Sequence, residues 1–175
     1  MEIAIIADDA KKELMTQFCI AYCGILSKHN LCATATTAKY ISEYLEPLGS
    51  FSLTASMVSN YVKKDLIGNP VKKQYDREQI ARLFFVAVAK NVLSIEDIRL
   101  LFEMQHETYE PKRAYDYFCS EFENVLQFVF GLKENLDTVG TDSNDTKTML
   151  RNTIIAVAYK VCVGRLENFN HINAL

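Results

Sequence analysis

Residues 52–102 are the part of this sequence that most constrains the fold. In chain order they show apolar side chains at helical spacing, a break at Gly68-Asn69-Pro70, a lysine-bearing turn, and two further runs of apolar side chains at helical spacing. The same stretch holds eight of the 19 lysines and arginines of the chain, and four of these lysines lie within residues 63–73. We therefore expect a small helix-turn-helix unit here, and we interpret the remaining segments around it.

Capping side chains mark where the helices of this unit are expected to begin. They are Thr54 before a helix at 55–64, Asp76 before a helix at 77–91, and Ser94 before a third helix. The first helix is expected to bury an apolar side made of Met57, Val58, Tyr61 and Val62. Residues 71–75 are interpreted as a short extended arm, or wing.

The outward side of the first helix, together with the arm, predicts contact with DNA. Small polar side chains can bond to base edges, and each lysine that neutralises a phosphate steepens the salt dependence of binding. Residues 63–73 hold four lysines and one aspartate, which is also compatible with a solvated turn. The residues predicted at base edges are Ser56, Ser59 and Asn60, and those predicted on phosphates are Lys63, Lys64, Lys72 and Lys73.

The order of residues in this unit resembles the DNA-binding domain of MerR-type regulators. The matching positions are Tyr61, Leu66-Ile67, Pro70, Tyr75 and the segment 93–98. The resemblance implies a mainly α, MerR-like winged helix-turn-helix fold with additional C-terminal helices, and a role in regulating transcription. Ser59-Asn60 stand where that family usually has arginine and tyrosine, so its base contacts do not transfer to this chain.

The similarity is closer still to an uncharacterised bacterial family of predicted MerR-like regulators, a domain of unknown function. It covers about residues 40–129. The segments that carry it are LTASMVSNYVKKDLI, PVKKQYDREQIA and PKRAYDYFCSE.

The first 44 residues predict a short β-α-β-like fragment. Glu2–Ala7 reads as a buried strand, a helix follows Asp8 or Asp9 as far as about Lys28, and Asn30–Thr34 reads as a second strand.

These residues resemble the opening of methylglyoxal synthase over about 43 positions. The resemblance implies a lyase acting on dihydroxyacetone phosphate, with phosphate-binding positions at Asp9, Lys12, Thr34, Thr36 and Thr37. Three positions depart from the family: Asp8 replaces a histidine, and Ala35 and Ala38 replace glycines of the phosphate loop, where alanine resists positive φ and close approach. The alternative is that the segment packs only as structure, with a helix around 36–44.

A helix at 40–48, ended by Pro47 and Gly49, marks a candidate boundary. We divide the chain into segments 1–44, 45–110 and 111–175.

The C-terminal segment is expected to be helical. An aromatic stripe on a helix at 112–132 predicts core packing, although a ligand pocket is an alternative. The last helix, at 148–169, has a near-heptad seam of Leu150, Ile154, Val157, Val161 and Leu166. This seam predicts either a homodimer or packing against the rest of the chain.

Composition and motifs exclude several classes of protein. The formal net charge is −3, which argues against a polycation but not against a local basic patch. The most apolar stretch is too short to span a bilayer, and neither a secretory signal nor a P-loop, dinucleotide fingerprint or metal-ligand set is present. The five scattered cysteines predict reduced thiols in a cytoplasmic protein. We expect a DNA-binding regulator without cofactor or metal, with a lyase or a protein-interaction module as alternatives.

Overall fold

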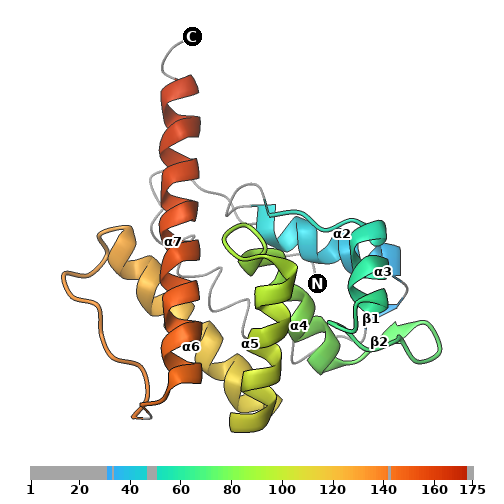
Figure 1. The fold of residues 1–175 in the computed structure, drawn as a ribbon. Coiled ribbons are helices and arrows are strands. Elements are labelled where there is room, and N and C mark those ends of the chain that lie inside the picture. Colours follow the sequence, from blue (N-terminus) through green and yellow to red (C-terminus); the bar gives the residue numbers. More distant parts are fainter. Residues whose placement is uncertain (1–30, 33, 47–50, 142, 173–175) are drawn as a thin grey trace.

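The structure is a computed structural model that describes residues 31–32, 34–46, 51–141 and 143–172 (Figure 1). This part of the chain contains six helices and two very short strands. In order they are β1 (Leu31–Cys32), α2 (Thr34–Leu45), α3 (Ala55–Lys63), β2 (Gln74–Tyr75), α4 (Arg77–Ala89), α5 (Ile95–Thr108), α6 (Pro111–Val129) and α7 (Asp145–Ile172). The predicted mainly helical fold class is confirmed. The strand and helix predicted within 2–28 lie outside the described residues.

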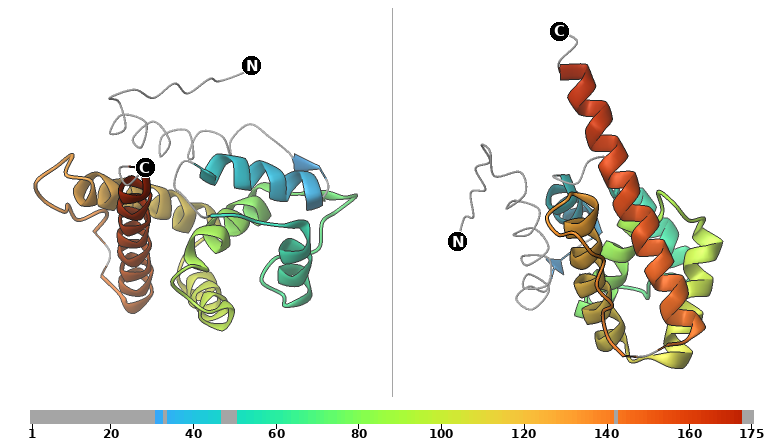
Figure 2. Two further views of the ribbon diagram at one scale, coloured as in Figure 1. Left: turned by 90° about the horizontal axis from the view of Figure 1, so that it is seen from above. Right: turned by 90° about the vertical axis from the view of Figure 1, so that its left-hand side faces the viewer.

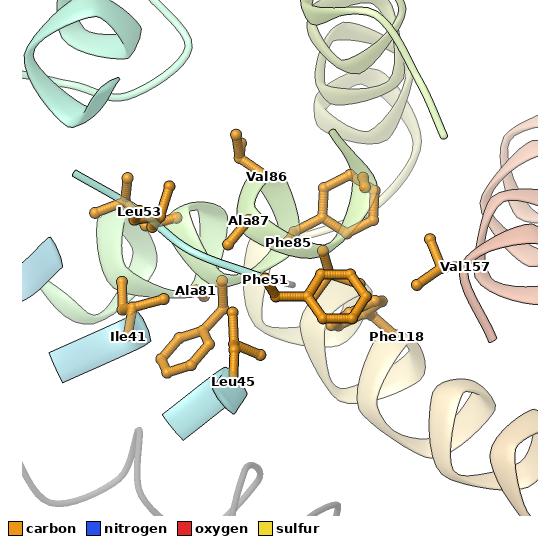
Figure 3. Close-up of a cluster of buried hydrophobic side chains, with 14 of the residues drawn as sticks. Ile41, Leu45, Phe51, Leu53, Ala81, Phe85, Val86, Ala87, Phe118 and Val157 are labelled. Atoms are coloured by element: carbon orange, nitrogen blue, oxygen red, sulfur yellow. The ribbon is translucent and has the colours of Figure 1, made fainter. Parts of the chain in front are cut away.

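Helix α4 forms the centre of the core. Nine of its 13 residues are buried, so the helix is apolar on nearly all sides, as expected for a helix surrounded by other elements. Figure 3 shows Ala81 and Phe85 of α4 between Ile41 and Leu45 of α2 on one side and Phe118 of α6 on the other. The core therefore joins the helix-turn-helix unit to the C-terminal helices.

The start of α2 differs from the sequence prediction. The helix begins at Thr34 and ends at Leu45, whereas the sequence predicted a strand through Thr34 and a helix over 40–48. The alternative prediction of a helix around 36–44 is confirmed, because α2 contains this range. Its buried side, which includes Ala38, Ile41 and Leu45, packs against α3 and α4. Burial of this apolar side accounts for the longer helix, because tertiary packing rather than local propensity supplies most helix stability. The predicted boundary between residues 44 and 45 falls inside α2.

The strand predicted at Asn30–Thr34 is present only as Leu31–Cys32. It pairs antiparallel with β2, with Leu31 opposite Tyr75 and Cys32 opposite Gln74. A β-α-β unit would instead place its strands parallel and next to each other. The described second strand of the predicted fragment thus pairs with the hairpin of the helix-turn-helix unit.

Helices α6 and α7 pack along each other, and α7 continues beyond the other helices (Figures 1 and 2). The side chains of Ile154, Val157 and Val161 on the predicted seam are buried within this chain. Packing of the seam against the chain itself is therefore what the described residues show, and the homodimer stays a prediction. The aromatic stripe of α6 is confirmed as core at Phe118 and Phe122. No helix in the described ranges has the length and hydropathy needed to cross a membrane.

Helix α7 begins three residues earlier than predicted. The Asn144 side chain accepts a hydrogen bond of 2.9 Å from the Lys147 N–H and so caps the first turn. The polar segment before it is held in place by a network of side chains.

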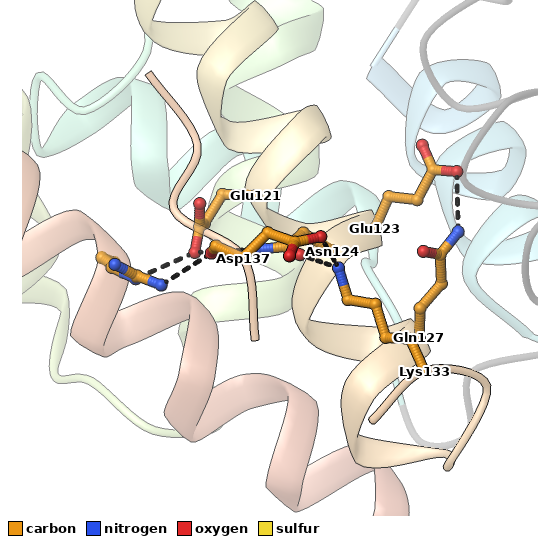
Figure 4. A network of polar contacts seen from close by, with 7 residues as sticks. Glu121, Glu123, Asn124, Gln127, Lys133 and Asp137 are labelled. Carbon is orange, nitrogen blue, oxygen red and sulfur yellow. Dashed lines mark hydrogen bonds and ion pairs between the residues drawn. The ribbon is translucent and has the colours of Figure 1, made fainter. Parts of the chain in front are cut away.

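That network is centred on Glu121, whose side chain is fully buried (Figure 4). The Nε atom of Arg151 lies 3.0 Å from Glu121 Oε1, and its Nη2 donates to the Asp137 carbonyl at 3.0 Å. Asn124 donates to the same carbonyl at 2.9 Å and accepts a hydrogen bond from Lys133. The network therefore holds the connection between α6 and α7 against both helices.

The wild-type protein is expected to lose stability as the pH rises through the pKa of Glu121. The Glu121→Gln variant should not show this loss. Burial raises the pKa of the Glu121 carboxyl above its ordinary value of 4.5, although Arg151 opposes this shift. A carboxyl that holds its proton more tightly in the folded chain contributes stability that is fully present below its unfolded pKa. That contribution is lost as the pH rises through the folded pKa.

The free energy of unfolding in urea, measured for both chains between about pH 4 and pH 7, tests this expectation. The wild-type value minus the Glu121→Gln value should fall with rising pH. A difference that rises or stays level would show that the folded pKa is not raised.

Candidate nucleic-acid interface

Helix α3 exposes the polar side that the sequence predicted. Thr54 caps it by accepting a hydrogen bond of 3.1 Å from the Met57 N–H. Val58 and Tyr61 are buried, whereas the predicted DNA-facing residues of the helix are exposed, namely Ser56, Ser59, Asn60 and Lys63. The assignment of Met57 to the buried side was wrong, because its side chain is 38% exposed. Only one narrow stripe of this nine-residue helix reaches the core.

The C-terminus of α3 is closed by a Schellman motif. The Leu66 N–H donates to the Tyr61 carbonyl at 3.0 Å, and the Asp65 N–H donates to the Val62 carbonyl at 3.1 Å. Asp65 occupies the left-handed position of the motif, with φ of 57°. Leu66 and Tyr61, which occupy the positions that usually make a hydrophobic contact in this motif, are both buried. The direction in which the chain leaves α3 is thereby set.

We expect Asp65→Gly to stabilise the protein by about 0.5–1 kcal/mol, because glycine adopts positive φ without the strain of a Cβ atom. Urea unfolding measures the change. Asp65→Ala is the matched control, since alanine loses the aspartate side chain but keeps the Cβ. A glycine variant no more stable than the alanine variant would contradict the expectation.

The predicted wing is a tight hairpin with two lysines at its tip. Val71 and Gln74 exchange two backbone hydrogen bonds, each of 2.9 Å. Between them Lys72 and Lys73 have φ values of 49° and 65°, and both are exposed. Two-residue turns with positive φ at both positions favour asparagine and glycine, so lysine is an unfavourable choice for the turn itself. Backbone strain of this kind gathers at functional positions.

The base of this hairpin is held firmly. Tyr75 is buried, and the Gln79 amide donates to the carbonyls of Gly68 and Asn69 at 2.9 and 3.1 Å. The Gln79 side chain also accepts from the Asp76 N–H at 2.9 Å, while Asp76 accepts from the Gln79 N–H at 2.8 Å. This capping box ties the turn at 68–70, the hairpin and the start of α4 together. The lysine tip is therefore presented on a rigid support.

Lys64 lies apart from the other predicted residues. Its Nζ atom is 3.3 Å from Glu96 Oε1 at the start of α5, and both side chains are largely exposed. An ion pair this exposed contributes little to stability, but it offsets part of the charge of Lys64. Six of the seven predicted residues thus lie on α3 and the hairpin. The seventh, Lys64, pairs with α5 instead.

Two basic residues near this surface escaped the sequence analysis. Arg77 is exposed in the first turn of α4, directly after the hairpin. A basic side chain at a helix N-terminus opposes the helix dipole, so its presence there is unusual for a purely structural role. The sequence already placed Arg77 directly after the predicted cap Asp76, so this residue could have been found. Lys90 donates to the Ser52 carbonyl, and its Nζ lies 3.7 Å from the Met57 sulfur of α3. Burial lowers the pKa of Lys90. No local signal could have found this contact, because it joins residues 33 and 38 positions apart.

The residues that the methylglyoxal synthase resemblance singled out do not form a described site. Asp9 and Lys12 lie outside the described residues. Thr34, Thr36 and Thr37 belong to α2, where the resemblance implied a phosphate-binding loop. The Thr37 side chain is fully buried.

Comparison with known protein families finds one family that matches the middle of the chain. Residues 32–118 match the family described as Domain of unknown function (DUF1836). This segment is a DUF1836 domain. It extends from the second residue of β1 into α6, so it contains α3, the hairpin and all seven predicted DNA-contacting residues, Lys64 included. The DUF1836 domain also crosses both predicted segment boundaries. No solved structure matches the chain.

Curated proteins similar to the chain include methylglyoxal synthases, and the similarity covers part of the chain. The protein of Caldicellulosiruptor saccharolyticus is 65% identical over 43 residues, which is 25% of this chain and 30% of that protein. The Oceanobacillus iheyensis protein is 44% identical over 69 residues, covering 34% of this chain and 49% of that protein. The Clostridioides difficile protein is 32% identical over 114 residues, which covers 55% of this chain and 82% of that protein. The chain thus spans from about a third to half the length of the first two of these relatives.

Proposed function

We propose that the DUF1836 domain binds double-stranded DNA as a MerR-like winged helix-turn-helix and serves as a transcriptional regulator. The observation that carries the proposal is that α3 and the hairpin lie at the same end of the molecule (Figures 1 and 2), and that the polar residues of α3 and the two tip lysines are exposed. Helix α2 packs against α3.

The chemistry of this surface fits a duplex. An α-helix fits the major groove, where hydroxyl and amide side chains can bond to base edges. Ser56, Ser59 and Asn60 supply such groups on successive turns of α3. Lys63 at the end of α3 and the two tip lysines would contact phosphates. Lysine acts there as a point charge, which positions the protein on DNA without reading sequence.

Fluorescence anisotropy of a labelled duplex, titrated with the whole chain at two salt concentrations, tests the proposal. Three lysines on phosphates predict a slope of about −2.7 for the logarithm of the binding constant against the logarithm of the salt concentration. A rise from about 50 to 200 mM salt should then weaken binding roughly 40-fold. Absence of binding at micromolar protein in low salt would reject it and would favour a protein-interaction module on the same fold.

The partial similarity to methylglyoxal synthases points to lyase activity as a second candidate. The described part of the chain gives this candidate little support, because the positions expected in a phosphate loop form α2 and Thr37 is fully buried. Helical backbone with a buried threonine cannot wrap a phosphate as a glycine-containing loop does. Release of phosphate from dihydroxyacetone phosphate, assayed at high protein concentration, would restore this candidate.

A further inference from the structure

A chamber with several polar and charged side chains in its lining lies where three C-terminal elements meet, at the end of α5, the first half of α6 and the start of α7. It has a volume of about 330 Å³, within the usual range for small-molecule sites. Its lining includes Tyr109, Arg113, Tyr117, Ser120, Thr141 and Lys147. The chamber is separate from α3 and the hairpin and contains none of the residues assigned above to DNA.

Two cations on different helices give this chamber positive charge. The Arg113 guanidinium lies over the Tyr109 ring at 5.2 Å, and the Lys147 ammonium lies over the Tyr117 ring at 5.4 Å. Lys147 also donates to the Gly140 carbonyl at 3.0 Å. Asp116 supplies the single carboxylate among the described lining residues, and it forms an ion pair of 2.7 Å with Lys112. The balance of charge therefore favours an anion.

The Tyr117 hydroxyl adds an unused donor. The oxygen is buried and has no hydrogen-bond partner among the described residues. A buried polar group without a partner is costly and calls for an explanation. Burial, followed by the nearby Glu121 carboxyl, raises the pKa of Tyr117 to about 12, so the hydroxyl keeps its proton at neutral pH. It can donate to an acceptor atom of a ligand.

An apolar cavity adjoins the chamber. It has a volume of about 70 Å³ and is lined by aromatic side chains that include Phe85, Phe102 and Phe118. Gln105, Ala114, Thr146 and Leu150 line both spaces, so the two are neighbours. A ligand that occupies both spaces would place an anionic group among the cations and a small apolar group against the aromatic rings.

We propose that this pair of cavities binds a small organic carboxylate that carries an aromatic or short aliphatic group. The carboxylate is held by Arg113 and Lys147, and the Tyr117 hydroxyl donates to it. The apolar group packs against Phe102 and Phe118. A carboxylate suits this geometry because it has two acceptor oxygens for donors from two helices.

Isothermal titration calorimetry with the whole chain tests this proposal, with 3-phenylpropionate as the probe. The uncharged 3-phenylpropionamide and inorganic phosphate are the comparison ligands. The acid should bind about tenfold or more tightly than the amide, because hydrogen bonds to a charged group are the stronger ones. Equal binding of the acid and the amide, stronger binding of phosphate, or no binding of the acid would overturn the proposal.

Variants locate the site. Lys147→Gln and Arg113→Gln should each weaken binding of the acid by about tenfold and leave binding of the amide unchanged. Arg99→Gln is the matched control, because Arg99 pairs with Glu103 outside the chamber and its loss should change neither affinity. Arg113 is exposed, so its replacement leaves the core intact if Lys147→Gln fails to fold. Unchanged affinity in the Arg113 variant would contradict the assignment.

Discussion

Replacement of both tip lysines, Lys72→Glu with Lys73→Glu, is expected to weaken DNA binding on the order of 100-fold at about 0.1 M salt. Loss of two phosphate contacts alone accounts for roughly 60-fold at this salt concentration, and repulsion by the new carboxylates adds to the loss. The slope of the binding constant against salt should become shallower by about two units for the same reason. Anisotropy titrations of the wild type and the variant at several salt concentrations measure both quantities.

A second pair of substitutions separates charge from folding. Lys72→Asn with Lys73→Gly places the residues that positive φ favours at the hairpin tip, so stability should rise by about 1–2 kcal/mol while DNA binding falls roughly 60-fold. Lys112→Glu with Lys160→Glu is the matched control, because it changes the net charge as much as the glutamate pair but lies on α6 and α7. Equal weakening by this control would show that only the overall charge matters. Undiminished binding by the Asn-Gly variant would remove the hairpin from the interface.

Truncation of Phe118 to alanine is expected to destabilise the protein by about 3–5 kcal/mol. The Phe118 ring is 3% exposed and packs edge-on against Phe85 at 5.2 Å between ring centroids. It also stacks on Phe122 at 5.7 Å. The substitution therefore opens a cavity where α4 meets α6, and the loss includes both transfer energy and vacated contacts. Phe118→Leu keeps most of the volume and should cost less.

Urea unfolding of the Phe118 variants, followed by circular dichroism and by tyrosine fluorescence, measures this loss. Because Phe85 belongs to α4 and Phe118 to α6, and the two rings pack together, both probes should report one shared transition. Two separated transitions would show that residues 111–175 unfold independently, as the predicted division of the chain would allow.

Local capping chemistry made the beginnings of several helices predictable. Thr54, Asp76 and Ser94 each accept a hydrogen bond from the backbone three residues later, and helices α3, α4 and α5 begin directly after them. Such bonds join neighbours in the chain, so residue type and spacing suffice to indicate them. The polar side of α3 was predictable for the same reason, because it follows from helical periodicity alone.

Contacts between distant residues escaped prediction. The sequence could not show that Lys64 pairs with Glu96 or that Lys90 reaches Ser52, because neither pair has a local pattern. It also placed α7 too late, since its cap at Asn144 lies within a polar stretch that reads as a loop. The chamber at Arg113 and Lys147 was foreseen only as a pocket alternative to the aromatic core, without its cations.

The sequence by itself determined the mainly helical class, the caps of α3, α4 and α5, the break after α3 and the lysines of the hairpin. These depend on interactions within a few residues, or on the period of apolar side chains. Only the tertiary structure decided that α2 starts at Thr34, that Leu31–Cys32 pairs with the hairpin, and that the seam of α7 packs inside the chain. The physical reason is that burial against other elements outweighs local preference, and burial depends on which segments meet in space.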